Sequence, residues 1–413
     1  MFFYFMPPFV EFNWWAQYLP DLKWGYITPG VWLASVIIHK NKLSSHKLST
    51  AYWVIGFYIY TLIITYALAV DLENAKIYSQ MLFVYCIVMV LNIKTIFKFE
   101  QLRFIVFMII VISANLFITT YGEGSFDSGR LNNVGPGDAN GSNELGVLLV
   151  SILPFMIPFI IKGKMFERLI CLMILPVLVN VITMTVSRGA VVALLFSVFY
   201  AFIVLGNRKI KKYILISIVC IVPAFVLLAD DGYMKRISTL WNADTSSEAA
   251  MNDLSSGRTE TWKDGYKMLQ DHPLGTGPGG FRALSRFYMD ENNLTYKYGM
   301  EYGVRAAHNS FLLVLVEQGY IGFIIFLIIC VMTLYKLFKS YRTIKKLGMS
   351  GSFIDLFIIS LNMSFVCTLF GGAFNSRVYY EFFWWQVALT VVASSIVAKE
   401  ISTDVKGPLS PAI

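Results

Sequence analysis

The sequence has little charge for its length: only 15% of its 413 residues are charged, whereas 56% are hydrophobic. Soluble domains carry about 25% charged residues, so this composition argues against a soluble globular protein. Histidine and cysteine are also scarce, with four and five copies. The cysteines all lie in apolar stretches and none has CxxC spacing, which excludes a disulfide framework or a zinc site of that kind. They are Cys86, Cys171, Cys220, Cys330 and Cys367.

Signals for nucleotide and nucleic-acid binding are absent as well. The glycines at 275, 277, 279 and 280 predict a tight turn, but no GK[ST] follows them, so they do not form a phosphate-binding loop for ATP. The net charge of +8 is spread over short connections and forms no basic stripe. We therefore expect no cofactor and no nucleic-acid partner.

Long apolar stretches dominate what is present. Eleven of them reach the roughly 17–25 residues needed to cross a hydrocarbon core. They lie near 24–39, 52–70, 77–96, 103–120, 144–161, 168–185, 188–205, 211–229, 308–338, 353–373 and 379–397. A twelfth stretch at 2–20, interrupted by Pro7 and Pro8, is interpreted as a kinked span, with a helix lying on the membrane surface as the alternative. The sequence thus predicts an all-α polytopic membrane protein with about twelve transmembrane helices in one domain over residues 1–413.

The charged connections predict the orientation of these helices. Alternate connections, around 40–50, 94–103, 162–168, 206–212 and 336–346, hold eighteen Lys and Arg against two acids. Because Lys and Arg in short loops remain in the cytoplasm, the other connections face outward and both termini are cytoplasmic. The largest outward connection is an inserted loop at 230–307.

Two arginines open predicted helices on the outward side. Ser256 can cap a helix that has Arg258 in its first turn, and Ser187 can cap a membrane helix that Arg188 begins. A cation opposes the helix dipole there, which is reasonable if the arginine and the free backbone N–H groups bind an anion together. A solvated surface arginine at 258, and one at 188 that extends to the membrane interface, are the competing interpretations.

His308 lies at the start of the apolar stretch that follows the large loop. We expect it in the first turn of that helix, where the helix dipole and neighbouring arginines disfavour its protonated form. A neutral imidazole near anion-binding arginines is suited to transferring a group away from a phosphate leaving group. A histidine that simply satisfies its hydrogen bonds at the membrane interface is the alternative.

The ordered motifs resemble a known family. They are "SRG" opening a span at 187, "GR" with a following Trp262, "HPLGTGPGGF" at 272–281 and "AHNSFLLVLVEQGYIG" at 307–322. This order resembles the O-antigen ligase and polymerase superfamily of bacterial envelope glycosyltransferases, most strongly over roughly 125–325. The stretch "GRLNNVGPGDANGSNELG" at 129–146 is similar to an earlier outward loop of that family.

The resemblance implies a polyprenyl-dependent glycosyltransferase of the GT-C type in the bacterial inner membrane, with its active site facing the periplasm. Such an enzyme takes a glycan from undecaprenyl diphosphate and joins its reducing end to an acceptor hydroxyl. Carried over to this sequence, Arg188 and Arg258 bind the diphosphate, and His308 activates or positions the acceptor. Further candidates for substrate binding are Arg130, Asn143, Trp262, Arg282, Arg305, Asn309 and Glu317. The implied partners are the lipid-linked glycan donor and acceptor, membrane lipids and a chain-length regulator protein.

We expect no metal requirement, because the acids of the outward loop are scattered without a DxD-type pair beside these residues. The acceptor separates the two activities of the family: a polymerase uses another lipid-linked repeat unit, and a ligase uses lipid A-core. Residues 230–307 hold nine Lys and Arg against eleven acids, which suits a densely phosphorylated core poorly and favours the polymerase. A transporter or flippase of lipid-linked oligosaccharide is a more remote alternative, which the scarcity of charges inside the spans disfavours.

Overall fold

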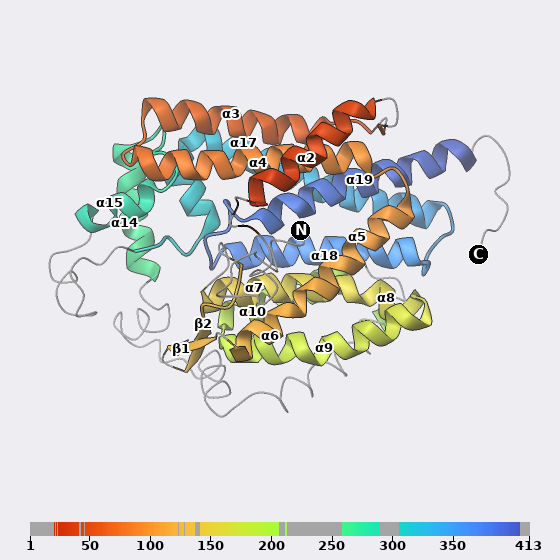
Figure 1. The fold of residues 1–413 in the computed structure, drawn as a ribbon. Coiled ribbons are helices and arrows are strands. Elements are labelled where there is room, and N and C mark those ends of the chain that lie inside the picture. Colours follow the sequence, from red (N-terminus) through yellow and green to blue (C-terminus); the bar gives the residue numbers. More distant parts are fainter. Residues whose placement is uncertain are drawn as a thin grey trace.

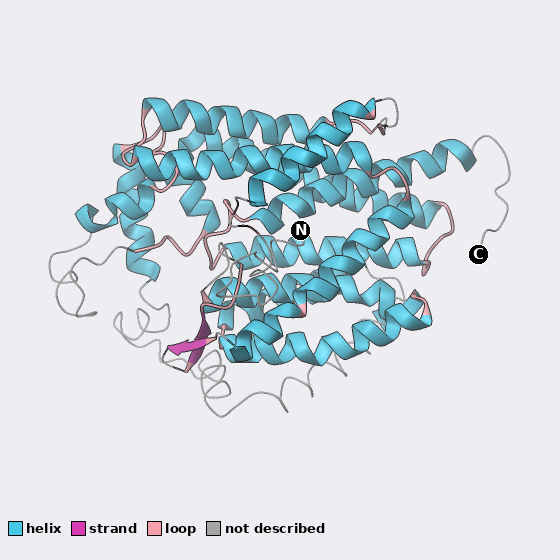
Figure 2. Cartoon of the chain, viewed as in Figure 1, coloured by secondary structure: helices cyan, strands magenta, loops and turns pink. Residues whose placement is uncertain are grey.

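The computed structural model describes residues 20, 22, 24–40, 43–44, 46–122, 124–127, 129–136, 141–205, 211–212, 258–288 and 305–404, with side chains up to residue 399. The predicted spans at 2–20 and 211–229, apart from residues 20, 211 and 212, and most of the predicted outward loop at 230–307 lie outside the described residues, as does Ser256. Helices make up most of the described part, and its two short strands form one hairpin (Figures 1 and 2).

The elements follow the apolar stretches of the sequence. In chain order they are α2 (Trp24–Ile38), α3 (Ser49–Ala67), α4 (Leu72–Thr95), α5 (Phe99–Ser113), α6 (Asn115–Gly122), β1 (Ser125–Asp127), β2 (Arg130–Asn132), α7 (Ser142–Ile152), η3 (Leu153–Phe155), α8 (Met156–Lys162), α9 (Met165–Thr185), α10 (Arg188–Tyr200), η4 (Ala201–Leu205), α14 (Arg258–Asp271), α15 (Gly280–Tyr288), α17 (Ser310–Lys346), α18 (Phe353–Gly372) and α19 (Glu381–Asp404). The strands pair antiparallel, with Ser125 opposite Asn132 and Asp127 opposite Arg130.

Within the described ranges, nine helices or runs of consecutive helices are long and apolar enough to cross a membrane. They coincide with nine of the predicted spans, so the prediction of an all-α polytopic membrane protein is confirmed. The predicted span at 24–39 forms α2, an apolar helix of 15 residues, which is shorter than the roughly 17 residues that a perpendicular crossing takes.

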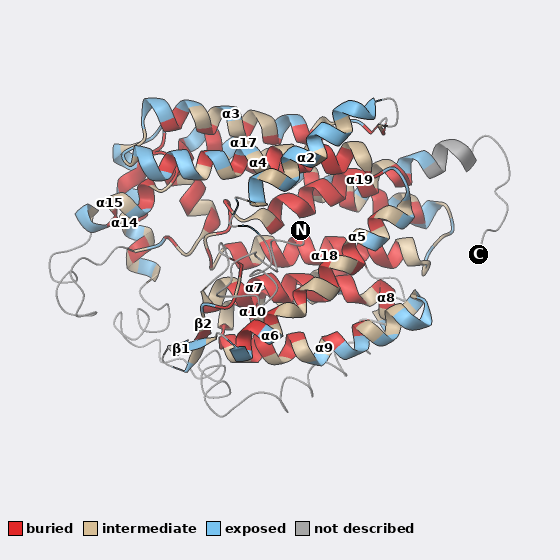
Figure 3. Ribbon diagram, viewed as in Figure 1, coloured by how far each residue is buried: buried red, intermediate tan, exposed pale blue. Residues whose placement is uncertain are grey.

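Burial separates central helices from peripheral ones. Of the 18 most apolar consecutive residues of α18, 83% are buried, against 28% in the run of α10 and η4. The buried residues gather on α7, α18 and α19, whereas α3 and α9 expose much of their surface (Figure 3). Because the exposed side chains of the outer helices include Leu195, Phe199 and Met173, their apolar outer faces suit contact with lipid.

One end of the bundle collects the loops that are predicted to face outward. The hairpin, α14 and α15 lie at the same end of the bundle in Figure 1. The N-terminal ends of α7, α10 and α17 lie there too, since their side chains contact one another as described below. This end therefore contains most of the polar residues that were predicted to form the site.

A break in α17 anchors the glycine-rich turn at this end. Gly319 has φ 62°, and a Cβ there would lie 2.3 Å from the carbonyl carbon of Leu274, so only glycine fits. The backbone N–H groups of Thr276 and Gly277 donate to the carbonyl oxygens of Val316 (3.1 Å) and Glu317 (3.0 Å), just before the break. The predicted tight turn is confirmed, and it holds the segment after α14 against α17.

Candidate active site

His308 precedes α17 and is not part of it. Asn309 caps the helix, with its side-chain oxygen accepting hydrogen bonds from the backbone N–H groups of Phe311 (2.9 Å) and Leu312 (3.1 Å). The prediction that His308 lies in the first helical turn was therefore wrong. Its φ of 46° is left-handed, a strained conformation for a residue with a Cβ that is found disproportionately at functional sites.

The His308 ring faces a carboxylate and is surrounded by cations. Its Nδ1 is buried without a hydrogen-bond partner among the described residues and lies 3.9 Å from Oε1 of Glu144, at the start of α7. Burial lowers the pKa of His308; Glu144 opposes the shift, and Arg258 and Arg130 add to it. Burial and the two arginines together outweigh Glu144, so the pKa is lowered and the imidazole is neutral near pH 7.

Asn143 links Arg130 to the start of α10 through hydrogen bonds. The Oδ1 of Asn143 accepts hydrogen bonds from Nη2 of Arg130 (2.7 Å) and from Oγ of Ser187 (3.1 Å). Ser187 also caps α10, since its Oγ accepts a hydrogen bond from the N–H of Ala190 (3.3 Å). The predicted cap is confirmed, and it places Arg188 at the first position of α10, next to this cluster.

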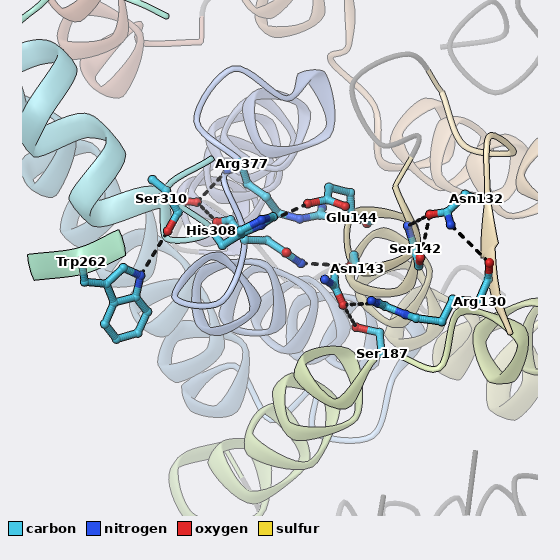
Figure 4. Close-up of polar contacts among 12 residues, drawn as sticks. Arg130, Asn132, Ser142, Asn143, Glu144, Ser187, Trp262, His308, Ser310 and Arg377 are labelled. Carbon is cyan, nitrogen blue, oxygen red and sulfur yellow. Dashed lines mark hydrogen bonds and ion pairs between the residues drawn. The ribbon is translucent and has the colours of Figure 1, made fainter. Parts of the chain in front are cut away.

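The connection between α18 and α19 supplies a buried arginine. Arg377 is 2% exposed; its backbone N–H donates to Oγ of Ser310 (2.8 Å), and its guanidinium donates to the carbonyl oxygen of Glu144. Asn375 donates to the carbonyl oxygen of Asn143 (2.9 Å). Figure 4 shows these contacts running continuously from Arg130 to Ser310, with His308 beside them. They fix the position of the two residues, Asn143 and Glu144, that contact Arg130 and His308.

The helix α14 closes the other side of His308. Arg258 is its first residue, as predicted, and the indole N–H of Trp262 donates to the carbonyl oxygen of Ala307 (3.1 Å), directly before His308 (Figure 4). Arg305 forms an ion pair with Glu260 of the same helix at 3.7 Å. The loop that carries His308 is thus attached to α14 by two contacts.

A family model described as O-antigen ligase matches residues 171–327. The segment belongs to the O-antigen ligase and polymerase superfamily. It contains Arg188, Arg258 and His308, and Arg130, Asn143, Glu144 and Arg377 lie outside it. No curated protein matches the chain.

Two residues of the site were not predicted from the sequence. Glu144 belongs to the loop at 129–146, where only Arg130 and Asn143 were selected, and it is an acid in the first turn of a membrane helix. Arg377 lies in the short outward connection at 374–378. The same argument that selected Arg188, a cation in a short outward turn, applies to Arg377.

Three predicted residues of the O-antigen ligase-type segment lie apart from His308 or serve another contact. Glu317 is buried and accepts hydrogen bonds from the hydroxyl of Tyr379 (2.8 Å) and the N–H of Phe281 (3.4 Å). Asn309 uses its side-chain oxygen to cap α17. Arg282 is exposed on α15. No group of three or more His, Cys, Asp or Glu that could hold a metal occurs in the part of the chain that the structure describes.

Proposed function

We propose that this protein is a membrane glycosyltransferase that joins oligosaccharide repeat units linked to undecaprenyl diphosphate, an O-antigen polymerase acting at the periplasmic face of the bacterial inner membrane. The observation that carries the proposal is a neutral His308 beside Glu144 and within the field of Arg258 and Arg130. This arrangement combines a proton acceptor with cations that attract a diphosphate.

In the proposed reaction the acceptor hydroxyl attacks the anomeric carbon of the donor glycan. The new carbon–oxygen bond forms as the bond to the diphosphate breaks, and the diphosphate leaves with the electron pair. Nδ1 of His308 is buried and faces Glu144, so Nε2 is the nitrogen available to take the hydroxyl proton. The Glu144 carboxylate then stabilises the imidazolium that forms, as paired carboxylates do in other histidine bases.

The arginines bind the leaving group in this proposal. Arg258, at the start of α14, and Arg130, in β2, both act on the charge of His308. Arg188 is the first residue of α10, directly after Ser187, which donates a hydrogen bond to Asn143. A guanidinium stays charged at all relevant pH and pairs with phosphate oxygens through two parallel hydrogen bonds. Stabilising the diphosphate in this way removes the need for a divalent cation.

An apolar groove gives the lipid chain of the donor a place to lie. A cavity of about 700 Å³ between α10, α17 and α18 is lined by side chains that include Phe196, Phe311, Leu334, Phe338 and Phe370. Phe311 lies three residues after His308, and Phe338 lies far along the same helix. The groove extends along α17 from Phe311 to Phe338, a length and an apolar lining that suit a long prenyl chain whose diphosphate lies beside the arginines.

The acceptor distinguishes the proposed polymerase from a ligase. The outward segment 230–307 carries more acids than bases, and a phosphorylated lipid A-core would be repelled by it. A second lipid-linked repeat unit has a glycan without that charge density. The family that matches residues 171–327 is described as O-antigen ligase, so the ligase is the second candidate.

Reconstitution distinguishes these functions. The purified protein in detergent is given lipid-linked repeat units, with and without lipid A-core, and the products are separated on a gel. A ladder in the absence of core is the expected result. Glycan attached to core identifies a ligase, and no transfer to either acceptor would contradict the proposal of a glycosyltransferase.

A further inference from the structure

A basic cavity lies at the end of the bundle opposite His308. It has a volume of about 1150 Å³ and is enclosed by residues 43–49, α17 and α19. Lys336 lies 26 positions after Ser310 in α17, which is roughly 39 Å at 1.5 Å per residue apart from the break at Gly319. This cavity is therefore separate from the candidate active site, and it adjoins the apolar groove at Tyr335, which lines both.

Cationic side chains converge on the cavity from three parts of the chain. Lys47, Lys336, Lys339 and Lys399 line it together with His46, and none of its described lining residues is Asp or Glu. Burial lowers the pKa of His46, and Lys399 and Lys94 lower it further, against a hydrogen bond to the carbonyl oxygen of Ile96 that raises it. Burial is the largest cause, and the smaller contributions of Lys399 and Lys94 come from positive charge near His46.

Part of the wall is apolar. Leu43, Phe97, Met332, Tyr335 and Val397 line the same cavity as the lysines. Lysines that only determine topology need no shared cavity, and Lys98, Lys162 and Lys164, which are exposed and predicted to lie on the same membrane face, do not line it. A cavity with cationic and apolar walls is complementary to an amphipathic anion.

We propose that this cavity binds a phosphate-bearing anion, with the phosphate among Lys336, Lys339 and Lys399. Two sources share this chemistry, the headgroup of an anionic phospholipid and free inorganic phosphate. The apolar wall favours the phospholipid, because acyl chains would cover Phe97, Met332 and Val397, whereas inorganic phosphate would leave them uncovered. The inference does not depend on the proposed transferase activity.

The test uses thermal unfolding of the full-length protein in neutral detergent, followed by tryptophan fluorescence. Dioleoylphosphatidylglycerol, dioleoylphosphatidylcholine and inorganic phosphate are each titrated into the wild type and two triple variants. One variant removes the cavity lysines (Lys336→Gln, Lys339→Gln, Lys399→Gln). The matched control removes three lysines from the same predicted face (Lys98→Gln, Lys162→Gln, Lys164→Gln).

Phosphatidylglycerol should raise the melting temperature of the wild type and the control, and phosphatidylcholine should not. In the cavity variant the half-saturating phosphatidylglycerol concentration should rise about tenfold or more, since each lysine near an anionic headgroup contributes several-fold to affinity. If inorganic phosphate gives the same pattern, free phosphate is the ligand. Equal responses of the cavity and control variants would overturn the proposal. Should the triple variant fail to fold, Lys339→Gln alone, at an exposed position, should raise that concentration about threefold.

Discussion

Nδ1 of His308 lies 3.9 Å from Oε1 of Glu144, although one residue precedes α17 and the other lies in the first turn of α7. The carboxylate raises the pKa of the imidazole, whereas burial, the strongest influence, and Arg258 and Arg130 lower it. The net effect is a neutral ring whose buried nitrogen faces an acid. This relationship determines the pH dependence that the proposed mechanism requires.

Glu144→Gln should move the acid limb of the activity profile to lower pH. The pKa of the wild-type His308 is lowered from its ordinary value of 6.5. Activity should therefore fall as the pH decreases through this lowered pKa. Removing the carboxylate removes the influence that raises the pKa, so the limb shifts further down while maximal activity also decreases. Initial rates between pH 4.5 and 8 measure the shift, and a limb that moves upward would contradict the pairing.

Arg188→Lys and Arg258→Lys should each reduce transfer at least about tenfold. Lysine keeps the charge but loses the paired hydrogen bonds to phosphate, and a charge-assisted hydrogen bond contributes roughly 1.5–3 kcal/mol. Donor turnover by each purified variant is the measurement. Arg286→Lys, at an exposed position on α15, is the matched control and should retain wild-type turnover. A normally expressed lysine variant with wild-type turnover would remove that arginine from the diphosphate site.

The sequence predicted the membrane helices better than the polar contacts between them. Long apolar stretches identify spans without knowledge of their neighbours, and Ser187 at the start of α10 follows from local capping preferences. The position of His308 was missed because Asn309, the next residue, is the better cap and begins the helix. The choice between neighbouring capping residues thus decides whether His308 lies inside the helix or before it.

The partners of the site could not be predicted in the same way. Arg377 contacts Glu144 across 233 positions of the sequence, a pairing that depends on how α18 and α7 pack. Glu317, which we grouped with the site, instead meets Tyr379 and Phe281 because α17 breaks at Gly319 and the glycine-rich turn fills the break. Packing of helices that are distant in the sequence decides these contacts, and periodicity carries no information about it.

Gly319→Ala should destabilise the protein, whereas Gly348→Ala should have a smaller effect. Both glycines have left-handed φ angles, of 62° and 71°, but only at Gly319 would a Cβ meet backbone, 2.3 Å from the carbonyl carbon of Leu274. The backbone strain common to both costs about 1–2 kcal/mol, and the clash adds to it at Gly319. Melting temperatures in one detergent compare them, and equal losses would show that α17 does not need the close approach.

Transfer should survive chelation of divalent cations. In the proposed mechanism the arginines supply the charge that neutralises the diphosphate, a role that a metal ion fills in other enzymes. Activity is measured before and after treatment with EDTA. Loss of activity that added Mg²⁺ or Mn²⁺ restores would point to a metal site and would contradict this division of roles.

The central claim is that His308 serves the acceptor while the arginines serve the leaving group, and one paired measurement on His308→Ala tests it most directly. Transfer and binding of the lipid-linked donor are measured on the same preparation, with Arg258→Lys alongside. General-base catalysis contributes ~10²–10⁴-fold, so the alanine variant should lose transfer by that factor and bind donor as the wild type does, whereas Arg258→Lys should weaken donor binding. Wild-type transfer by His308→Ala, or a loss of donor binding equal to its loss of transfer, would contradict the account.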